Sequence, residues 1–361
     1  MGEGQIIKKN YNGIDAAKFV CSLLVIAIHI SPLGADKNQL LTYLNYGIQK
    51  YIARIAVPFF FISSGYFLFK KTSIQEYEIN HAKKYIIKIL RLYLLWTLIY
   101  MPISIYAIVK DNEGILHGIW EYSRNVLFVG SYPHLWYLRA LIVATIIISL
   151  FLYRRKNPNK ILVIAFVLYL IGVFGNAWSV VLLPLKQSIP TIWRLLKTIG
   201  KVMVTTRNGL LFGFFFMSLG MSFSYYGNRI KKETALTGFI LSMILLGGEV
   251  LFLKYNYKHI YEYDMYIFLA PSAYFLFSFC EQAEMKDSKI YKTLRIMGSL
   301  VYFIHLWVAF ALINGYKIFK MDLDNTVFYF ISVTLITLII SYLIYRLSMK
   351  EKYKMLQKLY S

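Results

Sequence analysis

Ten apolar runs, most of them close to twenty residues long, follow one another along this 361-residue chain. A helix needs about 20 mainly apolar residues to cross a bilayer, and no strand pattern or low-complexity tract competes with these runs. The sequence therefore predicts an all-α integral membrane protein, a bundle of about ten transmembrane helices. The expected spans are 14–33, 52–69, 89–108, 135–152, 161–183, 209–225, 234–253, 264–281, 296–314 and 327–346.

Composition agrees with a membrane protein, because 58% of the residues are hydrophobic and soluble proteins contain roughly 45–50%. The runs leave no room for a second folded domain, so we expect one membrane domain over 1–361, with 347–361 as a basic cytoplasmic tail. The first run is too long for a signal peptide and has no cleavage site behind it, which predicts an uncleaved anchor. Cys21 and Cys280 lie inside apolar runs, where packing is the expected role.

The net charge of +22 comes from lysines and arginines grouped between the spans, which indicates membrane topology and anionic lipid, not nucleic acid. With the N-terminus in the cytoplasm, 25 of the 40 basic residues fall on inward segments. This bias predicts a multi-pass protein of the cell membrane with both termini cytoplasmic. The outward segment 184–208 is also basic. It suits an anionic ligand, or anionic lipid or polymer at the outer face.

The first span carries three ionisable residues, Asp15, Lys18 and His29, and such residues inside a membrane indicate function by default. Lys18 and His29 are eleven residues apart, close to three helical turns, so they share one face with His29 roughly 16 Å deeper. Asp15 and Lys18 are spaced to pair. The alternative places Asp15 and Lys18 among lipid headgroups and leaves His29 to bond a neighbouring helix.

The third span opens with a basic helical face formed by Lys84, Lys88 and Arg91. At the cytoplasmic boundary this face suits phosphates, to which arginine offers a two-pronged hydrogen bond. The same face is also explained by the enrichment of basic residues on the cytoplasmic side of membrane proteins, or by contact with phospholipid headgroups. No glycine-rich phosphate loop is present, so a nucleotide-containing donor has to be held by basic side chains.

In the second span, Ser63, Ser64 and Gly65 are small residues that permit close helix packing. A serine nucleophile is the competing idea, but the chain lacks a Gly-x-Ser-x-Gly elbow here. Packing is therefore the prediction.

Further polar residues lie at or inside the later spans. His134 precedes the fourth span, where it suits substrate binding or anchoring in the membrane interface. Arg207 and Asn208 open the sixth span at the expected outer face. Glu249, inside the seventh, requires a partner, with Arg54, Arg207 and Lys254 as candidates, and suits acceptor binding or structural pairing. His305 lies in the middle of the ninth span.

Together His29 and His305 place two histidines at mid-membrane depth. Metal binding needs further ligands, and no carboxylate or cysteine stands at ligand spacing. We therefore expect no metal.

These motifs resemble the acyltransferase-3 family of integral membrane acyltransferases. Lys18, ten residues and then His29 is similar to the Arg/Lys-x10-His signature of that family. The segment Phe60-Phe-Ile-Ser-Ser-Gly-Tyr resembles its second-helix motif. Lys88-x-x-Arg91 stands where the family has an Arg-x-x-Arg-like pair, from which the lysine departs, and Tyr302-x-x-His305 resembles its late Tyr-x-x-His.

The chain resembles still more closely the membrane half of vancomycin-resistance-type serine racemases, over nearly its whole length. The shared segments are Val57-Pro-Phe-Phe-Phe, His134-Leu-Trp-Tyr-Leu, Arg207-Asn-Gly, Gly248-Glu249 and Asp264-x-Met-Tyr266. Those racemases carry a soluble pyridoxal-phosphate domain after the membrane half. We expect this chain to consist of one membrane domain with a basic tail, so racemase activity is not carried over to it.

The resemblance implies transfer of an acyl group, usually acetyl, from cytoplasmic acyl-CoA to a hydroxyl of an envelope glycan or related acceptor at the outer face. It makes His29 the candidate catalytic base and assigns Lys18, Lys88 and Arg91 to the CoA. The imidazole either takes the proton of the attacking hydroxyl or is itself acylated. For the acceptor, Glu249, Arg207, Asn208, His134 and His305 are the candidates, with Asp15 as a structural partner.

Two other functions are compatible with the same residues. A small-molecule permease, for an amino acid such as serine, also uses intramembrane polar groups, although the chain lacks the internal repeat of many transporters. The other is a membrane anchor or partner protein without activity, which the intact stripe from Lys18 to His29 disfavours.

Overall fold

The computed structural model describes residues 11–33, 39–72, 78–110, 114–191, 194, 198, 205–257, 264–318 and 326–361. Across these ranges the chain forms helices and turns and no strand, which confirms the all-helical part of the predicted fold class. Eight helical segments are long and apolar enough to cross a membrane. They are α1 (Asn12–His29), α2 with η1 and α3 (Gln39–Lys50, Ile52–Ile55, Ala56–Phe69), α4 (Ile79–Lys110), α6 (Trp136–Tyr153), η3 with α10 (Gly209–Gly213, Phe214–Tyr226), α11 (Lys232–Asn256), α13 (Lys289–Ile318) and α14 (Thr326–Ser348).

Two of the ten predicted spans are not continuous long helices. In the range 161–183, α7 (Pro158–Phe174) ends and the chain bends by 80° into η2 (Ser179–Leu182) and α8 (Leu185–Ser188). In the range 264–281, helix begins only at α12 (Leu269–Glu281). The described residues thus hold eight candidate spans, or nine if the bent pair is one span. The cytoplasmic position of both termini stays a prediction from charge.

Side-chain hydrogen bonds explain why helix is absent ahead of α12. The amide oxygen of Asn176 accepts from the backbone nitrogens of Asp264 and Met265, both at 3.0 Å. The Glu249 carboxylate accepts from Ile267 N and Phe268 N, at 2.8 and 2.9 Å. Backbone polar groups at membrane depth need partners inside the protein, and these two side chains supply them without a helix.

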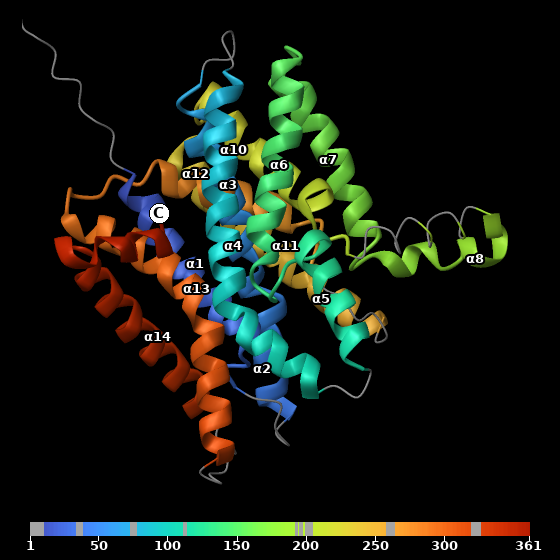
Figure 1. Ribbon diagram of the computed structural model, residues 1–361. Helices are drawn as coiled ribbons and strands as arrows, with labels where there is room; N and C mark the ends of the chain where they lie inside the picture. Colours follow the sequence, from blue (N-terminus) through green and yellow to red (C-terminus); the bar gives the residue numbers. More distant parts are fainter. Residues whose placement is uncertain are drawn as a thin grey trace, which may run out of the picture.

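The centre of the bundle is made by two close helix pairs, α3 with α10 and α1 with α13. Figure 1 shows α14 on one flank and α7 on the other, with α3 and α4 between them. Gly65 of α3 lies against the backbone carbonyl of Met217, and Gly220 of α10 against that of Ile62. The packing role predicted for Gly65 is confirmed. Cys21 and Cys280 are buried free thiols, as expected.

The basic C-terminal segment is folded onto the bundle. It forms η4 (Glu351–Leu359), whose last carbonyl accepts a hydrogen bond of 3.0 Å from the indole nitrogen of Trp96 on α4. The Tyr360 and Ser348 hydroxyls lie 2.8 Å apart. This segment is therefore a docked element with exposed lysines, not a free tail.

We expect Gly220→Ala to destabilise the protein, because the added Cβ would lie 2.6 Å from the backbone nitrogen of Tyr66 on α3. Overpacking against backbone costs about 1–3 kcal/mol. The matched control is Gly248→Ala on α11, where no heavy atom lies within 4 Å of the new Cβ. Thermal unfolding in detergent should show a lower midpoint for the first variant only. Equal midpoints would contradict the close α3–α10 contact.

Candidate functional site

Two cavities lie at opposite ends of α1 and share one wall residue, Tyr302. We name them the His29 cavity and the Lys18 cavity after the α1 residue that lines each. The His29 cavity comprises about 460 Å³ of space between atoms, part of it open solvent, and its polar lining consists of His29, Arg54, His134, Arg207, Asp264 and Tyr302. The Lys18 cavity comprises about 890 Å³ of space between atoms, part of it open solvent, and its polar lining consists of Lys18, Ser64, Tyr85, Lys88, Tyr137, Arg295, Ser299, Tyr302 and Tyr360.

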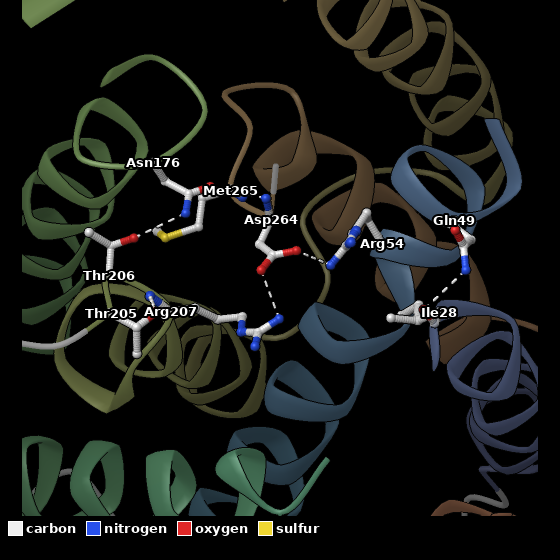
Figure 2. A network of polar contacts seen from close by, with 9 residues as sticks. All are labelled: Ile28, Gln49, Arg54, Asn176, Thr205, Thr206, Arg207, Asp264 and Met265. Carbon is white, nitrogen blue, oxygen red and sulfur yellow. Dashed lines mark hydrogen bonds and ion pairs between the residues drawn. The ribbon is translucent and has the colours of Figure 1, made fainter. Parts of the chain in front are cut away.

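The position of His29 follows from the end of α1. This helix stops at His29, which leaves its last carbonyl groups without helical partners. The side-chain amide of Gln49 on α2 donates to Ala27 O at 3.1 Å and to Ile28 O at 3.3 Å, the second contact being visible in Figure 2. Gln49 thereby fixes the end of α1, with His29 turned into the cavity.

Three histidines from different helices and loops meet beside this cavity. The ring of His305 on α13 lies 5.4 Å from that of His29 and 5.3 Å from that of His134, between centroids. His305 Nδ1 lies 2.9 Å from the carbonyl oxygen of Tyr302. Because a carbonyl only accepts, Nδ1 carries the proton and Nε2 presents a lone pair. That Nε2 and both ring nitrogens of His134 are buried without a hydrogen-bond partner among the described residues.

An ion triad forms another wall of the His29 cavity. Arg54, from η1 at the base of α3, pairs with one carboxylate oxygen of Asp264, and Arg207 Nη1 pairs with the other at 2.7 Å. Figure 2 shows Asp264 between the two arginines. The guanidinium of Arg207 also lies over the Trp136 ring, 4.8 Å from its centroid. Two cations thus share one anion beside His29.

The sequence offers Arg54 and Arg207 as candidate partners of Glu249. That pairing is wrong, because both arginines bind Asp264. The third candidate, Lys254, lies over the rings of Tyr43 and Tyr46, at 4.0 and 3.9 Å from their centroids. Arg54 lies inside an apolar run, which was a sequence signal that it has a partner, but nothing in the sequence identified Asp264 as that partner.

Lys18, Lys88 and Arg295 place three cationic groups on the Lys18 cavity. Asp15 was predicted to pair with Lys18, but in the described part of the chain its ion pair is with Arg295, at 3.7 Å. Lys18 instead lies 5.2 Å from the centroid of the Phe67 ring. Arg295, which the sequence reasoning missed, comes from α13. The basic cluster before the ninth span was its only sequence signal.

Ser64 is turned to the Lys18 cavity, where its hydroxyl lies 3.0 Å from that of Tyr137. Arg91, expected to bind CoA with Lys88, is exposed on α4 and does not line the cavity. Lys88 is exposed as well, but it lines the cavity.

Two of the expected acceptor residues are occupied with holding the backbone. The Glu249 carboxylate accepts from the Trp178 indole at 2.6 Å, in addition to its two bonds ahead of α12. Asn208 accepts from Leu210 N and Leu211 N, both at 2.9 Å. Neither residue lines the His29 cavity. The geometry therefore gives structural roles to both and leaves Arg207, His134 and His305 at or beside the cavity.

Fold and site together define a multi-pass helical membrane protein with a polar centre at the His29 cavity. The sequence model of a protein family described as an acyltransferase domain matches residues 11–346. The chain belongs to this acyltransferase-3 family, and this membership supports a membrane acyltransferase. No solved structure matches the chain.

Curated relatives of this chain are racemases by name. An amino-acid racemase from Enterococcus faecalis is 31% identical over 75% of this chain and 36% of the relative. A second from that organism is 28% identical over 95% of this chain and 47% of the relative. A serine/alanine racemase from Enterococcus gallinarum is 29% identical, over 73% and 36%. The chain spans between about a third and a half of the length of these relatives.

We expect Asp264→Asn to destabilise the protein strongly, because it leaves the buried Arg54 and its neighbour Arg207 without their shared anion. Removing one partner of a buried ion pair costs about 3–5 kcal/mol. Asp287→Asn is the control, since Asp287 is exposed and has no ion pair among the described residues. Denaturant unfolding in detergent should separate the two variants. A wild-type midpoint for Asp264→Asn would contradict the triad.

Proposed function

We propose that this protein is an O-acyltransferase that moves an acyl group, in the first place acetyl, from cytoplasmic acyl-CoA to a hydroxyl acceptor at the outer face of the cell membrane. The observation that carries the proposal is the shared wall at Tyr302. A cavity with three cations lies on one side of this residue, and a cavity with histidines lies on the other. Donor phosphates and acceptor hydroxyl thus have separate entrances to one reaction centre.

Charge favours the Lys18 cavity for the donor. Lys18, Lys88 and Arg295 come from three different helices and converge on one hollow, whose lining also includes aromatic rings of Tyr85, Tyr137 and Phe303. Phosphate groups bind to such cations through charge-assisted hydrogen bonds. About 16 Å of helix rise separates Lys18 from His29, so the donor's thioester arm has to extend along α1 toward Tyr302.

His29 supplies the proton transfer in this proposal. Its imidazole takes the proton from the acceptor hydroxyl as the oxygen attacks the thioester carbonyl. The carbon–oxygen bond forms, the carbon–sulfur bond breaks, and the CoA sulfur leaves as a thiolate that regains the proton. The His305 ring lies next to the His29 ring, and its Nε2 has a free lone pair. This lone pair is suited to fix the tautomer of His29 or to stabilise its positive charge. Direct acylation of the imidazole remains the second route.

The acceptor that we propose is an envelope glycan or a related hydroxyl compound. Amino acids are further candidate acceptors, because the relatives are called amino-acid or serine/alanine racemases. Their names describe proteins at least about twice as long as this chain.

A permease for a small molecule such as serine is the second candidate. The observation that favours it is the pair of polar cavities with a common wall at Tyr302, an arrangement that suits passage as well as transfer. Serine uptake into proteoliposomes without acyl-CoA distinguishes it. The acyltransferase instead predicts one added acyl mass on an envelope polymer or metabolite when the protein is present.

We expect His29→Ala to lower acyl transfer by about 10²–10⁴-fold, the range of a lost general base. Mass spectrometry of the acylated product, from cells with each variant, provides the measurement. His117→Ala on α5 (Ile115–Phe128) is the control, because His117 is an exposed histidine that lines neither cavity. A normal product level in a folded His29→Ala protein would remove His29 from the mechanism.

For the donor site, Lys18→Ala and Lys88→Ala should each weaken acetyl-CoA binding several-fold, since a cation at a partly solvated phosphate contributes about 1 kcal/mol. Arg91→Ala, which removes a cation from the same helix as Lys88 but outside the cavity, should leave the affinity unchanged. Equilibrium binding of labelled acetyl-CoA to the purified protein tests this. If Arg91→Ala weakens binding as much as Lys88→Ala, the donor lies on the helix surface and not in the cavity.

A further inference from the structure

We infer that the wall of the His29 cavity formed by Arg54 and Arg207 binds a carboxylate, so that the ligand of this cavity is a small hydroxy acid or the carboxylated end of a larger molecule. This inference depends on the proposed function in one respect only, namely that the ligand is the acyl acceptor. The site itself follows from burial, charge and unfilled hydrogen bonds.

Arg54 is the first part of the argument. Its side chain is 9% exposed and lines the cavity. Its Nη1 is bound to Asp264, but its Nε is buried with no hydrogen-bond partner among the described residues. A buried donor without a partner costs about 1–3 kcal/mol, and more when it is charged. Arg54 therefore carries a charged side chain that the described residues pair only in part, and this side chain lines the cavity.

Arg207 is the second part. Its side chain is 32% exposed, and its ion pair with Asp264 engages a single nitrogen, Nη1. The Trp136 ring beneath the guanidinium holds its plane in place, and Trp136 also lines the cavity. An arginine held in this way keeps further N–H donors for a planar anion.

The charge balance points in the same direction. Asp264 compensates one guanidinium, so the triad retains one positive charge in a protein interior. Charged groups inside membranes are costly unless they pair or serve a ligand. A carboxylate restores neutrality and matches the two-pronged geometry of arginine. The histidine of the same cavity then lies beside the hydroxyl end of the ligand.

A different use of the same charge has to be separated from this one. The arginines are also placed to stabilise an oxyanion that develops during acyl transfer. In that case the two arginines stabilise the transition state, and the free protein does not bind a charged acceptor more tightly than a neutral one. Binding measured without any acyl donor distinguishes the two roles.

The experiment compares glycerate with glyceramide, which has the same hydroxyls and an amide in place of the carboxylate, by calorimetric titration of the purified full chain without acyl-CoA. We expect glycerate to bind at least about tenfold more tightly, the size of a charge-assisted pair. Arg207→Gln should remove this preference, because glycerate then loses the charged partner of its carboxylate. Arg229→Gln, which replaces an exposed arginine over the Tyr226 ring, should preserve the preference.

Equal binding of the two probes, no saturable binding of glycerate, or an undiminished preference in Arg207→Gln would each overturn the inference. Thermal unfolding of each variant confirms that it is folded. Arg207 is the residue to replace, because the more exposed arginine can be removed while Arg54 still neutralises Asp264.

Two results separate this inference from the proposed function. If glycerate is preferred but no acyl transfer occurs with acetyl-CoA, the carboxylate site stands and the acyltransferase proposal fails. If acyl transfer occurs without the preference for glycerate, the acyltransferase proposal stands and the carboxylate site fails.

Discussion

The architecture depends on how backbone groups at membrane depth are satisfied where helix stops. Ahead of α12, Asn176 and Glu249 accept hydrogen bonds from four successive or nearby backbone nitrogens. These bonds allow the segment to stay non-helical, because backbone groups away from water need partners within the protein. The non-helical course brings Asp264 to the cavity, and Asp264 in turn holds Arg54 and Arg207. The polar centre thus depends on α12 beginning only at Leu269, which leaves the residues before it outside the helix.

The same constraint separates what the sequence could predict from what it could not. Apolar runs determine continuous spans, because length and hydrophobicity alone decide whether a helix crosses. Eight predicted spans agree with helices for this reason. The ranges 161–183 and 264–281 are also apolar, but the first contains a bend after α7. The start of the second is held without helix by the side chains of Asn176 and Glu249. A periodicity within one segment contains no information about those partners.

The site was predictable to a similar extent. The spacing of Lys18 and His29 places both on one face of α1, and this local rule of helix geometry agrees with the two cavities that they line. The triad of Arg54, Asp264 and Arg207 joins three segments far apart in the sequence. Arg54 lies inside a predicted span and could be recognised as a charge in need of a partner, whereas Arg207 and Asp264 lie at the edges of predicted spans. The pairing of Asp264 with Arg54 and Arg207 follows from tertiary packing, which the local sequence does not specify.

Glu249 and Arg54 show how support is distinguished from function among buried polar residues of a membrane protein. Both are charged, and both lie where water is scarce. The carboxylate of Glu249 accepts three hydrogen bonds from the protein, so its capacity is largely used in holding the fold. Arg54 retains an unfilled donor at a cavity wall. Since unfilled donors are costly in a folded interior, the fold accounts for the hydrogen bonds of Glu249 and not for all of those of Arg54.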